Sequence, residues 1–191
     1  MYHTTISQPS HGYAVPPKPL NILIVDDDDH SRDLMKQLIE SHGHQVTALD
    51  EGMKCINRCN ECVFDLIFMD YHTNDLDGEV NGADILGMAR ECFDIKSHVY
   101  AYTGDNTAES VEVFRKNDMK GVFVKPVSAR LVDDFLTIIE KNMDNSSMLS
   151  RLAIRNRNFM YFGKPKLLTC CVPSSAPSCA HVQGHVPDNA R

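Results

Sequence analysis

The chain lacks the features that would place it in a membrane or on a secretory route. None of its 191 residues falls in a run of about 18 consecutive apolar residues, which a membrane-spanning helix requires. The N-terminus has neither the basic start nor the apolar stretch of a secretory signal. The seven cysteines are an odd number, which argues against a disulfide framework. We therefore expect reduced thiols, no membrane span and a cytoplasmic protein, which in a eukaryote could also be nuclear.

The chain also has few aromatic residues and no concentrated positive charge. Tryptophan is absent, aromatic residues make up 7% of the chain, and the net charge is −7. Most acidic residues lie between Leu20 and Asp144, whereas basic residues prevail after Asn145 but are widely spaced. Nucleic-acid binding needs clustered Lys and Arg, so no clear nucleic-acid site is expected. An acidic body can instead concentrate a divalent cation.

Composition divides the chain into three segments. Residues 1–19 contain four prolines and several polar residues without an apolar period, which predicts a flexible leader. Residues 20–144 carry regular apolar patterns and form the expected domain. Residues 145–191 are predicted to be a basic, disordered tail, although 148–162 retain some apolar content that could extend the last helix.

Short apolar runs alternate with amphipathic segments through the central part. Five runs have the length and β-branched content of buried strands, at 20–25, 45–49, 66–69, 98–102 and 122–124. Each is followed by a segment with apolar residues at helical spacing. Regular alternation predicts an α/β fold with a doubly wound, five-stranded parallel sheet and helices on both faces.

Polar residues follow four of these strands. They are Asp26 and Asp27, then Asp70, then Thr103, then Lys125. The carboxyl ends of parallel strands meet at one edge of a sheet, so these side chains should share a pocket. Three carboxylates at one site need a neutralising cation, and oxygen ligands of this kind suit Mg²⁺. A carboxylate can also act as a nucleophile toward phosphorus, with a lysine and a hydroxyl binding the phosphoryl oxygens.

The strand-end motifs resemble a known family. The four signatures of response regulator receiver domains are similar to Ile22–Asp27, Leu66–Asp70, Tyr102–Gly104 and Val124–Pro126, in that order. The resemblance implies a CheY-like, (βα)5 flavodoxin-like receiver fold. It implies Asp70 as phosphoacceptor, Thr103 as switch hydroxyl and Lys125 as phosphate-binding lysine. It also implies a Mg²⁺ site formed by Asp26, Asp27, Asp70 and the backbone carbonyl of His72.

The same resemblance implies a signalling protein rather than an enzyme. The phosphoryl donor would be a histidine kinase or a histidine phosphotransfer protein, and the output would be docking to a downstream protein. The usual docking surface of the family corresponds to Ala108–Phe123, and the bond before Pro126 is often cis in the family. No output domain is recognisable, which indicates a stand-alone receiver.

Some positions depart from the family pattern. Asn74 stands where a proline is usual after the phosphoacceptor, and Glu79–Asn81 lengthens the loop that follows. Val122, three residues before the lysine, replaces a residue that is often aromatic. These departures leave open a receiver-fold binding module that no longer takes phosphate. A haloacid-dehalogenase-type phosphatase with Asp26 as nucleophile is a further alternative, because Asp26-x-Asp28 is similar to the first motif of that family.

Cysteine and histidine clusters are the remaining candidates for chemistry. Cys55, Cys59 and Cys62 have no obvious fourth ligand for zinc, so partly buried helix thiols are the favoured interpretation. A denser group, Cys170 to His185, matches no standard metal-binding spacing. Asp28 and Asp29 are better explained by the start of a helix than as metal ligands.

Overall fold

The computed structural model describes residues 18–73, 80–93 and 95–163. The first ten elements alternate strand and helix, as predicted. In chain order they are β1 (Asn21–Val25), α1 (Asp29–Ser41), β2 (Gln45–Leu49), α2 (Gly52–Glu61), β3 (Leu66–Met69), α3 (Gly82–Cys92), β4 (His98–Thr103), α4 (Ala108–Lys116), β5 (Gly121–Val124) and α5 (Ala129–Lys141). Two further elements follow, α6 (Ser146–Arg155) and β6 (Phe159–Tyr161).

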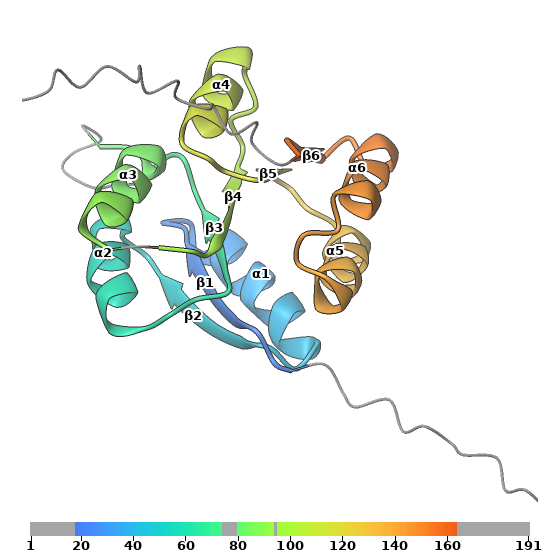
Figure 1. The fold of residues 1–191 in the computed structure, drawn as a ribbon, viewed down its shortest axis with the longest axis horizontal. Helices are drawn as coiled ribbons and strands as arrows, with labels where there is room; N and C mark the ends of the chain where they lie inside the picture. Colours follow the sequence, from blue (N-terminus) through green and yellow to red (C-terminus); the bar gives the residue numbers. More distant parts are fainter. Residues whose placement is uncertain (1–17, 74–79, 94, 164–191) are drawn as a thin grey trace, which may run out of the picture.

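The strands form a single sheet in the order β2-β1-β3-β4-β5-β6 (Figure 1). The first five strands are parallel, which confirms the predicted doubly wound arrangement. The sixth strand pairs antiparallel with β5, with Val122 opposite Met160 and Phe123 opposite Phe159. The chain reverses its direction of winding between β1 and β3, and open α/β sheets place their sites at the carboxyl ends of strands at such a point.

Each central strand is buried on both faces, which explains its nearly continuous apolar sequence. In β1, Ile22 and Ile24 face a core closed by α1, α5 and α6. Leu23 and Val25 face the opposite core, which α2, α3 and α4 close. Successive side chains point to opposite faces of a strand, so one short run supplies both cores.

Side-chain caps determine where several helices begin. Asp28, Thr107 and Ser128 each accept a hydrogen bond from the backbone N–H three residues ahead. Asn81 and Asp84 form a reciprocal capping box at the start of α3. The interpretation of Asp28 as a helix start rather than a metal ligand agrees with this geometry.

The prediction of a disordered tail from Asn145 is wrong for the residues that form α6 and β6. Leu149 and Leu152 on α6 and Phe159 on β6 are buried in the core that α1 and α5 also close. Their apolar pattern is too short to predict a buried segment by itself. The pairing of β6 with β5 explains why these residues are apolar. The leader at 1–17, the loop positions 74–79 and the Cys/His group between 170 and 185 lie outside the described residues.

This extension also changes the predicted docking surface at Ala108–Phe123. The outer edge of β5 is paired with β6, so β5 is not an edge strand. Arg115 on α4 lies over the ring of Phe162, with its guanidinium carbon 4.2 Å from the ring centroid. The segment that follows α5 therefore contacts both elements of the predicted surface.

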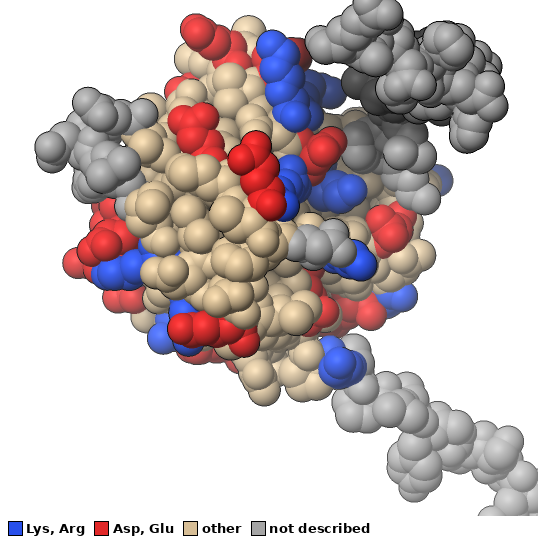
Figure 2. Space-filling model, turned by 60° about the vertical axis from the view of Figure 1, so that its left-hand side comes forward, with Lys and Arg blue, Asp and Glu red and all other residues tan. Residues whose placement is uncertain are grey.

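Charges of the two signs are interspersed on the surface. On the face drawn in Figure 2, Lys and Arg side chains lie among Asp and Glu side chains around a broad uncharged area. Across the described residues, no helix is both long enough and apolar enough to cross a membrane.

Candidate functional site

The residues predicted to share a pocket lie at the carboxyl edge of the sheet. Asp26 and Asp27 directly follow β1, and Asp70 follows β3, which is the neighbour of β1. Thr103 ends β4, and Lys125 follows β5. One carboxylate oxygen from each of the three aspartates lies within 4.8 Å of the other two. The predicted convergence of the carboxylates is therefore present in the structure.

Lys125 joins two of these carboxylates. Its Nζ lies 2.7 Å from Asp70 Oδ2 and 2.8 Å from Asp26 Oδ2. Nζ also lies 4.8 Å from the centroid of the Tyr102 ring, at cation–π distance. Burial lowers the pKa of Lys125, but its bonds to Asp26 and Asp70 outweigh burial and raise the pKa overall. Lys125 is consequently a fixed positive charge at the centre of the site.

Asp70 is held at both carboxylate oxygens. Oδ1 accepts a hydrogen bond from the backbone N–H of Tyr71 at 2.6 Å and a longer one from that of His72 at 3.4 Å. Oδ2 accepts from Lys125 Nζ. The backbone N–H of Asp70 donates to Val25 O at 2.8 Å, which continues the pairing of β1 and β3. The carboxylate is therefore buried and held in a fixed orientation.

Asp26 is the most deeply buried of the three aspartates, with no exposed surface. Burial raises its pKa from 3.8 to about 6, and the nearby Asp70 adds to the rise while Lys125 opposes it. Oδ1 accepts a hydrogen bond from Asp28 N. We regard the contact of Oδ2 with Lys125 as an ion pair, because that oxygen has no well-directed hydrogen bond within the described part of the chain.

The site fits a divalent cation. One oxygen from each of Asp26, Asp27 and Asp70 lies within 4.8 Å of the other two, and the buried Asp26 and Asp70 share the ammonium of Lys125. Oxygen donors of this number and charge suit Mg²⁺. Asp26, Asp27 and Asp70 are the residues that could hold it.

The side chains of Thr103 and His72 each make a polar contact with Asp105 rather than with the three clustered aspartates. Thr103 is fully buried, and its Oγ1 accepts a hydrogen bond from Asp105 N at 3.2 Å. Its hydroxyl proton is therefore available to another acceptor. The side chain of His72 is exposed, with Nε2 3.5 Å from Asp105 Oδ2. The role of the His72 carbonyl as a metal ligand stays a prediction.

Three contributors to the site were missed at the sequence level. Gly82 lies so close to Asp70 that an added Cβ would be 1.8 Å from Asp70 O, so α3 approaches the site only through glycine. The guanidinium of Arg32 donates to Asp26 O at 2.7 Å. The rings of Tyr71 and Phe114 meet edge to face, with centroids 5.2 Å apart. The Asn81–Gly82 helix start was the one local signal that could have indicated Gly82.

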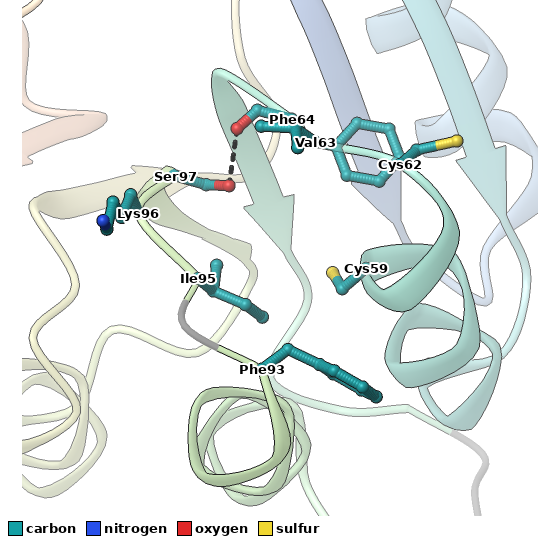
Figure 3. A pocket seen from close by; sticks show the side chains of 8 residues that line it. All are labelled: Cys59, Cys62, Val63, Phe64, Phe93, Ile95, Lys96 and Ser97. Carbon is teal, nitrogen blue, oxygen red and sulfur yellow. Dashed lines mark hydrogen bonds between the residues drawn. The ribbon is translucent and has the colours of Figure 1, made fainter.

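Cys59 of α2 and Cys62, directly after that helix, lie at the opposite edge of the sheet from the aspartate cluster. Cys59 and Cys62 line a cavity of about 210 Å³ between the ends of α2 and α3, before β3 and β4 begin (Figure 3). Cys55 is buried, and its Sγ lies 3.7 Å from Cys59 Sγ. The three form no metal-ligating group within the described residues, where the aspartate cluster is the only one found. Their interpretation as partly buried helix thiols agrees with this placement.

Comparison with solved structures identifies the fold. The CheY-like response regulator receiver domain protein from Methanospirillum hungatei superposes with a TM-score of 0.57 at 22% identity, over 73% of this chain and 100% of that chain. The Saccharomyces cerevisiae Ssk1 receiver domain, solved with the histidine phosphotransfer protein Ypd1, has a TM-score of 0.55 at 18% identity, over 65% of this chain and 90% of that chain.

Sequence comparisons give the same family. Transcription factor SKN7 from Candida albicans is 27% identical over 130 residues, or 68% of this chain and 22% of that protein. The chain spans about a fifth of the length of this relative, of SKN7 from Saccharomyces cerevisiae and of transcription factor prr1 from Schizosaccharomyces pombe. The family model described as the response regulator receiver domain matches residues 22–149, which include all the predicted site residues. The chain therefore belongs to the response regulator receiver domain family of two-component and phosphorelay signalling proteins.

Proposed function

We propose that this chain is a phosphorelay response regulator in which Asp70 accepts a phosphoryl group from a phosphohistidine. The observation that carries the proposal is the position of Lys125 Nζ, within 2.8 Å of both Asp26 and Asp70, beside a cluster of three carboxylates. A nucleophilic carboxylate, a cation site and a fixed ammonium are the parts that phosphoryl transfer to aspartate requires.

The reaction forms one bond and breaks one. The Asp70 carboxylate attacks phosphorus in line with the P–N bond of the phosphohistidine, the O–P bond forms, and the electron pair of the P–N bond remains on the imidazole. The backbone N–H groups of Tyr71 and His72 orient the carboxylate through Oδ1. Phosphoryl transfer depends largely on positioning and charge stabilisation, so this preorganisation lowers the barrier.

Two side chains then bind the transferred group. Lys125 exchanges its contact with Asp70 Oδ2 for a phosphoryl oxygen, and its contact with Asp26 keeps it at the site. The hydroxyl of Thr103, whose oxygen accepts a hydrogen bond from Asp105 N, donates its proton to a phosphoryl oxygen. Asp26, Asp27, Asp70 and the carbonyl of His72 would hold Mg²⁺, which when bound would supply positive charge for the phosphoryl oxygens.

The donor and the output are both proteins in this proposal. The Ssk1 receiver was solved with a histidine phosphotransfer protein, which supports a donor of that class or a histidine kinase. The downstream target docks where Ala108–Phe123 remains accessible beside β6. A cytoplasmic location, or a nuclear one as well in a eukaryote, fits a relay between proteins and the four free thiols among the described cysteines.

The family assignment favours this reading over the phosphatase alternative. Asp26, the nucleophile of that alternative, has no exposed surface, so its carboxylate is less accessible to an incoming phosphate ester than that of Asp70. The fixed binding module remains the second candidate, because Asn74, the added Glu79–Asn81 and Val122 depart from the family pattern in sequence.

Incubation with Mg²⁺ and acetyl phosphate, followed by intact mass and peptide mapping, tests the proposal. We expect one base-labile phosphate on Asp70 that requires Mg²⁺, and none on the Asp70→Asn variant. Asp134→Asn, which changes an exposed aspartate on α5, should label like the wild type. Phosphate on Asp26 would support the phosphatase, and no phosphate together with no Mg²⁺ binding would support the fixed binding module.

A further inference from the structure

The turn between α6 and β6 reaches the backbone on both sides of the site lysine. This turn follows residue 149, where the receiver family match ends. It is anchored on one side by Leu152 of α6 and on the other by Phe159 of β6, both buried in the core. The turn therefore has a defined position relative to the sheet, although it is not part of the five-stranded receiver core.

Asn158 supplies the contacts. Its Nδ2 donates one hydrogen bond to Val124 O and one to Pro126 O, each 3.0 Å long. Its backbone carbonyl accepts from Val124 N at 2.8 Å. A side-chain amide nitrogen has two donors, so both are used on the two carbonyls that flank Lys125. The bonds join a single side chain to the peptide unit directly before the lysine and to the one that follows Pro126.

Lys125 is thus held at its backbone from two directions. On the side of β4, its N–H donates to Thr103 O at 2.9 Å. On the side of β6, Asn158 holds the carbonyls before and after it. The Lys125 stem starts from this point and reaches Asp26 and Asp70 with Nζ. Rotation of the peptide between Val124 and Lys125, or displacement of Pro126, would move the start of the stem and displace Nζ from both carboxylates.

We infer that Asn158 is a positioning residue for phosphoryl transfer, acting through Lys125; the inference rests on the proposed function. The α6–β6 segment therefore helps to position the site lysine and also packs into the core. Asn158 touches neither the phosphoryl group nor Mg²⁺, and its effect is transmitted by the backbone of residues 124–126.

The test compares Asn158→Ala with the wild-type full chain. We expect the rate of Mg²⁺-dependent labelling of Asp70 by acetyl phosphate to fall about tenfold, because a small misplacement of a catalytic group has effects of this order or larger. Asn156→Ala is the matched control. Asn156 lies in the same turn, but its Nδ2 donates to Leu152 O within α6, so its loss should change the rate less than about twofold.

A double-mutant cycle separates positioning from general stability. In a Lys125→Ala background, Asn158→Ala should cause no further fall in rate, because the residue through which it acts is missing. Asn158→Leu keeps the branched shape without donors, and it replaces Asn158→Ala if the latter does not fold. An equal fall in both backgrounds would show a general structural effect and overturn the inference.

A second readout does not depend on phosphorylation. We expect ¹³C relaxation of the Lys125 ε-methylene, assigned with Lys125→Ala, to report an ordered side chain in the wild type and a mobile one in Asn158→Ala. Wild-type labelling rates and unchanged Lys125 order in Asn158→Ala would overturn the inference. If the wild type itself is not labelled on Asp70, the proposed function fails, and the relaxation result alone decides whether Asn158 positions Lys125.

Discussion

Gly121 lies against the carbonyl oxygen of Met160, so close that a Cβ on residue 121 would stand 2.2 Å from that oxygen. The contact is made across the β5–β6 pair, where Gly121 is opposite Tyr161. Only a residue without a side chain permits β6 to approach β5 at this distance. Gly121 at the start of β5 is therefore needed for β6 to pair with β5.

Gly121→Ala should displace β6 and lower the free energy of unfolding by about 2 kcal/mol, which is typical of overpacking a rigid contact. Urea denaturation followed by circular dichroism measures the change. Gly87→Ala is the matched control, because its Cβ would meet only Asn117 Oδ1, at 3.8 Å. That variant should be stabilised by about 0.5–1 kcal/mol through helix propensity. Equal stability of Gly121→Ala and the wild type would contradict the packing argument.

Mg²⁺ should stabilise the folded chain through its acidic cluster. A cation that binds only the folded state raises the free energy of unfolding, by about 1.4 kcal/mol at ten times its dissociation constant. We expect the melting temperature to rise with MgCl₂ at constant ionic strength, and the rise to disappear in Asp27→Ala. Asp29→Ala should retain the rise, since the Asp29 side chain is exposed and lies outside the cluster. A rise of the same size in Asp27→Ala would exclude this residue as a ligand.

The contribution of His44 and His98 to stability should decrease as the pH falls below about 6.5, because burial disfavours their protonation, whereas the raised pKa of Asp26 acts in the opposite direction. His44 is buried between α1 and β2, and burial lowers its pKa below 6.5, with His42 adding to the fall and Glu140 opposing it. The pKa of His98 is also lowered by burial, with Lys120 adding to the fall and Asp144 opposing it.

For such a group the unfolded chain takes up the proton first. The stabilisation is therefore complete above the unfolded pKa of about 6.5 and is lost as the pH falls through it toward the lower folded value. Urea midpoints at pH 7.5 and pH 5.5 measure the loss. His44→Gln should reduce the difference between the two midpoints, whereas His30→Gln, at an exposed position, should leave it unchanged. An unaltered difference in His44→Gln would assign the pH dependence to other groups.

Much of the site followed from local sequence. The apolar runs before Asp26, Asp70 and Lys125 are long enough to identify buried strands, and their parallel order brings their ends to one edge. The helix starts at Thr107 and Ser128 are also local features, because a capping side chain bonds to the backbone within three residues of itself. Buried strands and helix caps depend on the spacing of apolar residues and on residues close by in the chain, and both can be read from the sequence.

Contacts between distant segments were decided by the tertiary structure. β6 has only three residues, and it pairs with a strand more than thirty residues earlier, so no local period marks it. The link from Asn158 to the backbone around Lys125 likewise exists only after α6 has packed on the core. The burial of Asp26 and its raised pKa depend on the elements that surround it. Sequence alone therefore determined which residues lie at the strand ends. Packing decided how they are held there, because burial and long-range hydrogen bonds depend on how the whole chain folds.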